Sequence, residues 1–213
     1  MKLGIIVFYA IYLLLLFVGL IIDPFLKPIL IPLLLVYLLL NKTDRFLKLI
    51  IGALLFSTFG DVFLLFEDEL FFILGLGSFF VAHILYIIVF VKGIKSEYRL
   101  TINPVLLLSI STYLFLFLWY LVPHLGEMLI PVISYAVIIS VMLYLAVFWL
   151  IHSPTKPNLC IAIGALLFVV SDSVLAISLF KSAFSFDHFW VMLTYLSAQF
   201  LLIDGLIKRL RRT

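Results

Sequence analysis

Two aspartates stand inside long apolar runs, where a charged side chain is costly. Asp61 follows Ser57 in the stretch Ser-Thr-Phe-Gly-Asp, and Asp172 lies between Ser171 and Ser173. A carboxylate in the hydrocarbon of a membrane is so unfavourable that it commonly marks a functional site. Two carboxyls can act together in hydrolysis, one donating a proton while the other stabilises positive charge or activates water. The alternative is that each one clamps two helices together through a hydrogen bond.

Other polar side chains recur at helical spacing within the apolar runs. His83 and Tyr86 are three residues apart and Tyr195 and Gln199 are four apart, so each pair shares a helix face. An unpaired carboxylate at this depth would be neutralised or would destabilise its helix. We therefore expect Ser57, His83, Tyr195 or Gln199 within hydrogen-bonding reach of the two aspartates. For His83 alone, a hydrogen-bonded packing role is the alternative.

A third aspartate has a simpler explanation. Asp204 lies near the end of the last apolar run, four residues before Lys208. This spacing predicts an i,i+4 ion pair at the membrane surface, without a catalytic role.

The familiar catalytic and metal-binding motifs are missing. The chain has no HExxH motif, no GxSxG elbow, no Walker glycine loop and a single cysteine, Cys160. A metal held by Asp61, Asp172 and His83 is only weakly indicated, because a zinc site usually needs more histidine or cysteine ligands. We therefore expect no metal and no cofactor.

The composition identifies the medium in which these residues work. Of 213 residues, 66% are hydrophobic, 16% aromatic and only 12% charged. A soluble domain averages about 25% charged residues. A soluble ball of this composition would expose large apolar patches, which excludes a soluble enzyme, a nucleic-acid-binding protein and a disordered chain. No loop is long enough for a soluble domain, so residues 1–213 are expected to form a single integral-membrane domain.

Eight apolar runs could each supply the roughly 20 residues that a transmembrane helix needs. We expect an all-α, polytopic bundle of about eight transmembrane helices, with runs at 3–22, 25–40, 47–66, 70–91, 102–122, 128–151, 158–180 and 187–207.

The basic residues give an orientation. Of the 14 lysines and arginines, all but Lys27 and Lys181 fall on the side of the N-terminus. Basic residues accumulate on the cytoplasmic side, so both termini are expected in the cytoplasm. The acidic Glu67-Asp68-Glu69 loop is then outside. We expect a multi-pass protein of a bacterial cytoplasmic membrane.

The two halves of the chain share a short pattern. Gly-Ala-Leu-Leu-Phe occurs at 52–56 before Asp61 and again at 164–168 before Asp172. Four helices in each half would form two parallel repeats, with the carboxyls facing each other at one level in the outer half of the membrane. Chance recurrence in a leucine-rich chain is the alternative.

Taken in order, these residues resemble the YhhN-like lysoplasmalogenase family. The resemblance runs from about residue 23 to 205. The set is Lys27-Pro28, Gly60-Asp61-Val62, Ala82-His83 with Tyr86, Ser171-Asp172-Ser173 with Ala176, and Tyr195 with Ala198-Gln199. Single elements are weak signals, but the ordered set is specific.

The resemblance implies a membrane hydrolase that cleaves the vinyl ether bond of lysoplasmalogens, lysophospholipids held in the membrane. The products would be a fatty aldehyde and glycerophosphocholine or glycerophosphoethanolamine. Asp61 and Asp172 would be catalytic. Lys27 would meet the lipid phosphate, although a lysine snorkelling to the interface is the alternative. The candidate substrate-binding residues are Lys27, Ser57, His83, Tyr86, Ser171, Tyr195 and Gln199.

Two other function classes remain open at this point. A proton- or cation-coupled transporter could bind its ion between Asp61 and Asp172. A lipid-binding scaffold would keep the same residues for packing alone. An assay for aldehyde release separates the hydrolase from both. The sequence predicts no nucleic-acid partner and leaves the oligomeric state open.

Overall fold

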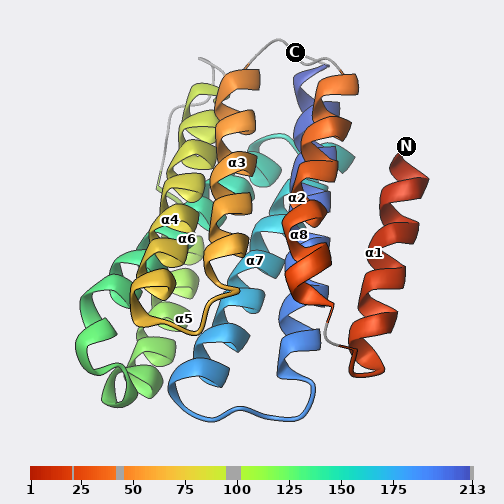
Figure 1. Cartoon of the computed structure of the whole chain (residues 1–213). Helices are drawn as coiled ribbons and strands as arrows, with labels where there is room; N and C mark the ends of the chain where they lie inside the picture. The colour runs from red at the N-terminus through yellow and green to blue at the C-terminus, as the bar shows by residue number, and fades with distance from the viewer. Residues whose placement is uncertain (21, 42–45, 95–101, 212–213) are drawn as a thin grey trace.

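The computed structural model describes residues 1–20, 22–41, 46–94 and 102–211, and in these ranges the chain is an all-α bundle (Figure 1). Its long elements alternate in direction, and both chain ends lie toward the same end of the bundle (Figure 1). We call this the terminal end and the opposite one the cavity end. The helices are α1 (Lys2–Phe17), α2 (Asp23–Leu40), α3 (Leu47–Phe63), α4 (Glu69–Lys92), α5 (Pro104–Leu121), the 3₁₀ turns η1 (Val122–His124) and η2 (Gly126–Met128), α6 (Leu129–His152), α7 (Lys156–Phe180) and α8 (Asp187–Leu210).

The eight expected runs correspond to the eight α-helices. Six of the described helices are long and apolar enough to cross a membrane, which makes the chain an integral multi-pass membrane protein. The other two are shorter than expected. The first run reaches only Phe17, because Gly19 then takes a left-handed turn with φ of 80°. The third ends at Phe63 and not at residue 66. Several basic residues counted for orientation lie outside the described residues, namely Lys42, Arg45, Lys95, Arg99 and Arg212.

Local sequence explains where several helices begin. The side chains of Asp68, Asn103 and Thr155 each accept a hydrogen bond from a backbone amide in the first turn of α4, α5 and α7. Such caps satisfy amides that have no partner within the helix. Prolines occupy the first turns of α2, α5 and α7, where the missing amide hydrogen costs nothing. These signals set the helix starts around the cavity end and the terminal end alike.

Small residues bring two helix pairs into close contact. In α3 and α4, a Cβ on Gly60 would fall 2.6 Å from the Phe79 ring. In α7 and α8, a Cβ on Gly164 would fall 2.9 Å from the backbone oxygen of Ala198, and one on Gly205 2.8 Å from that of Pro157. Close backbone approach of this kind is a common way for membrane helices to associate. The α3–α4 and α7–α8 pairs therefore form the two tightest units of the bundle.

The helix neighbours partly repeat between the two halves. α2 packs on α3 and α3 on α4, as α6 packs on α7 and α7 on α8. The cross-contacts also correspond, because α4 meets α6 and α8 meets α2. The first glycine of each shared pattern faces the following helix, Gly52 toward Leu85 and Gly164 toward Leu202. This arrangement agrees with a parallel repeat of four helices.

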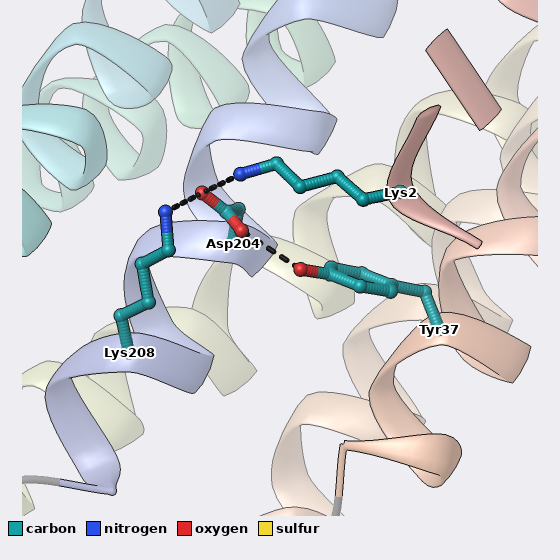
Figure 2. Close-up of polar contacts among 4 residues, drawn as sticks. All are labelled: Lys2, Tyr37, Asp204 and Lys208. Atoms are coloured by element: carbon teal, nitrogen blue, oxygen red, sulfur yellow. Dashed lines mark hydrogen bonds and ion pairs between the residues drawn. The ribbon is translucent and has the colours of Figure 1, made fainter. Parts of the chain in front are cut away.

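At the terminal end, Asp204 joins three helices (Figure 2). Its Oδ2 accepts hydrogen bonds from Lys208 Nζ at 2.7 Å and from Lys2 Nζ at 2.9 Å, and its Oδ1 accepts one from Tyr37 at 2.8 Å. The expected i,i+4 pair with Lys208 is confirmed. It is one part of a larger clamp that ties α1 and α2 to α8, and we call these four residues the Asp204 clamp.

Candidate active site

A cavity of about 760 Å³ opens at the cavity end of the bundle. That volume is within the range of sites that hold one small organic ligand. Its wall is built by α2, α3, α4, α6, α7 and α8 together with the segments between α3 and α4 and between α5 and α6. Asp61, Asp172, Lys27, Ser171 and Tyr195 all lie in that wall. The structure thus brings five of the nine predicted site residues to one place.

Each aspartate in the cavity is held by one tyrosine. Tyr195 on α8 donates to Asp61 Oδ2 at 2.8 Å, and Tyr135 on α6 donates to Asp172 Oδ2 at 2.5 Å. In the described part of the chain, Oδ1 of neither carboxyl has a hydrogen-bond partner, and neither is among the sealed, unpartnered atoms. Since both residues line the cavity, these oxygens are open to a ligand there. Asp61 is near the end of α3, whereas Asp172 is eight residues from the end of α7.

A short chain of hydrogen bonds fixes Tyr195 from behind. Gln199 Nε2 donates to the Tyr195 hydroxyl at 3.4 Å, and Tyr86 donates to Gln199 Oε1 at 3.2 Å. Tyr86 and Gln199 are fully buried and are not part of the cavity wall. Their place in the structure is therefore behind Tyr195, where they orient the hydroxyl that holds Asp61, and they do not line the space for substrate.

Ser57 and His83 also lie outside the cavity wall. The His83 ring approaches the carbonyl of Phe79 with Nδ1 at 2.6 Å, which requires the hydrogen on Nδ1. His83 Nε2 and the Ser57 hydroxyl are both sealed from solvent without a partner in the described residues. Ser171 is on the wall, but its hydroxyl donates to the backbone oxygen of Val191. None of these three residues bonds to either aspartate. Of the four alternative partners expected, Tyr195 is the one that bonds to Asp61, and Asp172 is held by Tyr135.

Lys27 occupies an unusual place for a lysine. It is only 7% exposed although it sits in the first turns of α2, and it lines the cavity. It is close enough to Asp61 and to Asp23 to interact with both charges. Within the described ranges it makes no hydrogen bond or ion pair, so its ammonium is available to an anion in the cavity. A snorkelling lysine would instead keep its ammonium in water.

Two further wall residues were missed by sequence reasoning. Asp23 at the start of α2 accepts hydrogen bonds from Tyr12 of α1, at 2.6 Å, and from His188 of α8. Asp23 and His188 both line the cavity beside Lys27. In the sequence, Asp23 and His188 lie at the ends of apolar runs, where polar residues are common. Nothing in the sequence indicates that these two residues, 165 positions apart, are in contact.

The mouth of the cavity is acidic. Glu67, Asp68, Glu69 and Glu127 are all wall residues, and Asp68 also caps α4. The rest of the wall is mainly aromatic and aliphatic, with Phe72, Leu76, Phe79, Val132, Leu175, Leu179 and Phe180. The cavity therefore combines a charged entrance with an apolar interior and two carboxyls. No group of three potential metal ligands of the His, Cys, Asp or Glu type occurs among the residues that the structure describes.

Comparisons with known proteins place the chain in a family. A model of the YhhN family matches residues 22–206. Lysoplasmalogenase TMEM86B of Mus musculus is 33% identical over 154 residues, which are 71% of this chain and 60% of the mouse protein. The human TMEM86B, also named a lysoplasmalogenase, is 32% identical over 76% of this chain and 65% of its own length. The chain thus matches less than two thirds of these mammalian relatives.

A bacterial relative is matched more evenly. The membrane protein YhhN of Escherichia coli O157:H7 is 27% identical over 163 residues, 76% of each chain. No solved structure matches this chain. From the family model and the mammalian relatives together, the chain belongs to the YhhN family.

Proposed function

We propose that this chain hydrolyses the vinyl ether bond of lysoplasmalogens, releasing a fatty aldehyde and glycerophosphocholine or glycerophosphoethanolamine. Relatives named lysoplasmalogenases support the reaction class. The observation that carries the proposal is the pair of carboxyls on one apolar cavity wall, each held by a tyrosine through one oxygen and open through the other.

The chemistry of a vinyl ether needs two such groups. One carboxylic acid gives its proton to the carbon that bears the alkyl chain, and the π electrons form the new C–H bond. The resulting oxocarbenium ion is stabilised by the second carboxylate, which also takes a proton from the attacking water. The hemiacetal then collapses as the second carboxyl protonates the departing glycerol oxygen and the first carboxylate accepts the hydroxyl proton. Both carboxyls are restored, and one water is consumed.

Lys27 is proposed to bind the phosphate of the lipid. Lys27 is largely buried in the cavity wall, and no anion of the described chain forms an ion pair with its ammonium. A lipid phosphate would supply the missing partner and offset the cost of burying a lysine. The nearby Asp61 would then lie on the head-group side of the cavity.

The orientation proposed from the basic residues fits this assignment. With both termini in the cytoplasm, the acidic mouth opens on the outer face of the cytoplasmic membrane of a bacterium. The polar products could leave through the mouth, while the aldehyde stays with the lipid. A reporter that works only in the cytoplasm should be active when it is fused to the C-terminus. Activity of a C-terminal reporter that works only outside the cytoplasm would overturn the orientation.

The test is aldehyde release by the full chain, purified in detergent. A lysolipid with a vinyl ether should be hydrolysed, whereas its saturated alkyl-ether analogue should not, because a saturated ether cannot form the cation by protonation on carbon. Equal turnover of both lipids would contradict the mechanism. No aldehyde from a panel of vinyl ether lysolipids would overturn the proposed function.

A further inference from the structure

A second, smaller hollow lies between α5, α6 and α7. It measures about 40 Å³ and shares Val132, Tyr135, Asp172 and Ala176 with the wall of the main cavity. These four residues are all that its lining has in common with that wall. Asp172 therefore borders both spaces, whereas Asp61 borders only the cavity. We call this hollow the α5–α7 groove.

The groove reaches the lipid-facing surface beside α5. Only Leu121 of α5 is buried, and the helix touches α7 at few points. Midway along it, the Tyr113 hydroxyl lies 2.5 Å from Ser173 Oγ. Because Ser173 already donates to the Val169 carbonyl, Tyr113 is the donor in this contact. Apart from this link and Ser140, the groove is lined beyond the shared wall by apolar side chains such as Leu114, Phe117 and Ile139.

The two spaces suit opposite ends of a single-chain lipid. The cavity mouth carries carboxylates and leads to Lys27, so it suits a charged head group and not an alkyl chain. The groove is small and mainly apolar. It meets the cavity at the wall that Asp172 and Tyr135 share, and it lies beside α5, whose side chains are mostly exposed. An alkyl chain that runs along it would never leave an apolar medium, which avoids a cost of about 0.8 kcal/mol for each methylene exposed to water.

We infer that the α5–α7 groove takes the first carbons of the substrate's alkenyl chain and leads the rest into the surrounding lipid, which makes Asp172 the proton donor. This inference rests on the proposed function. The bonds of the lipid run from head group to ether oxygen, then C1′, C2′ and the chain. With the phosphate at Lys27 and the chain in the groove, C2′ lies beside Asp172 and C1′ beside Asp61. The Asp172 proton goes to C2′, and the Asp61 carboxylate faces the cation at C1′ and takes the proton of the water that adds there.

The first test narrows the groove. Ala136 lines it, and the next residue of α6, Val137, is 44% exposed and outside both spaces. The quantity measured is kcat/KM for a long-chain vinyl ether lysolipid divided by kcat/KM for a short-chain one. Ala136→Phe should lower this ratio by about tenfold or more, and the control Val137→Phe should leave it unchanged. An unchanged ratio in a folded Ala136→Phe variant would overturn the groove assignment while leaving the proposed function intact.

A second measurement uses the wild-type protein, so it does not depend on a bulky substitution in the groove. A non-hydrolysable alkyl-ether lysolipid with a diazirine in the first part of its chain should label groove residues such as Leu114, Ile139 and Val169 in the wild-type protein. Labelling confined to α2 and α8 would place the chain elsewhere and overturn the inference.

The proton donor is tested with a substrate that needs no carbon protonation. In a saturated analogue that carries p-nitrophenoxide on C1′, departure of that group gives the same cation directly. Asp172→Asn should release p-nitrophenol within about tenfold of the wild-type rate, and Asp61→Asn should lose about 100-fold or more. The reverse pattern would make Asp61 the donor. Full vinyl ether activity in both variants would instead reject a catalytic role for either aspartate, and this inference with it, while leaving the proposed function intact.

Discussion

Buried carboxyls at the two ends of the bundle have opposite surroundings. At the terminal end, Asp204 uses both oxygens to accept hydrogen bonds from two lysines and a tyrosine (Figure 2). At the cavity end, Asp61 and Asp172 each accept one bond from a tyrosine and keep one oxygen free toward the cavity. A clamp satisfies its charge with protein groups, whereas a site leaves some capacity for a ligand. The depth of a carboxyl in the membrane does not distinguish a structural clamp from a ligand site, whereas the number of its hydrogen-bond donors within the protein does.

The largest contrast should appear when the carboxyls are neutralised. Asp61→Asn and Asp172→Asn are each expected to lower aldehyde release by about 10²–10⁴-fold, because each removes one acid–base group. The double variant should be little worse than either single one if the two residues act as a unit. Asp204→Asn is the matched control and should stay within a few-fold of the wild type. Near-normal activity in Asp61→Asn or Asp172→Asn would show that the substituted aspartate has a packing role and is not catalytic.

The reverse contrast should hold for stability. Asp204→Asn leaves two lysines and a tyrosine without their shared acceptor, which should cost about 1–3 kcal/mol. Because both lysines are more than 40% exposed, water screens them, and the lower end of that range is expected. Thermal unfolding in detergent measures the effect. Asp61→Asn and Asp172→Asn should unfold near the wild-type temperature, since the amide can still accept the tyrosine hydrogen bond.

The tyrosines should give a smaller contrast. Tyr195→Phe and Tyr135→Phe keep the ring and remove the donor to Asp61 and to Asp172, so turnover should fall about tenfold. Tyr37→Phe makes the same change at Asp204 and should not alter turnover. The three variants compared in one aldehyde assay test whether hydroxyls matter only in the cavity. Equal losses in all three would point to general destabilisation.

The smallest effect is expected at the edge of the clamp. Lys2→Gln removes one of two lysines on Asp204 and should cost less than about 1 kcal/mol, because its side chain is 42% exposed. Adding salt should shrink the difference in unfolding temperature between Lys2→Gln and the wild type. A difference that does not change with salt would mean that Lys2 acts through packing.

The helices were predictable because each depends on a local run of the sequence. All eight expected runs became helices in the described part of the chain, and the early end of the first is explained by one local feature, the turn at Gly19. Asp61 and Asp172 could also be found from the sequence, because a charged residue within an apolar run is recognisable without knowing which helices pack beside it. The Lys208 partner of Asp204 was predictable for the same reason, as both residues lie on one helix.

The partners across helices were not predictable from spacing. Tyr135 on α6 donates a hydrogen bond to Asp172 on α7. A tyrosine hydroxyl within an apolar run indicates that some partner exists, but the sequence does not say which one. Asp23 and His188 sit at helix ends and meet only because α2 and α8 pack together. Tyr86 and Gln199 were predicted near the site, but helix periodicity could not distinguish the cavity wall from the layer behind it.

The long separation of Asp61 from its tyrosine has a consequence for biosynthesis. Tyr195 follows Asp61 by 134 residues, so α8 leaves the ribosome long after α3. While the residues between α3 and α8 are being synthesised, α3 must therefore hold a carboxyl that lacks its tyrosine donor. α3 is followed at once by α4, and the Gly60–Phe79 contact lets the two helices enter the membrane as a hairpin. The arrival of α8 then gives Asp61 its tyrosine donor and ties α1 and α2 in place through Asp204, so the site is completed only once α8 has packed.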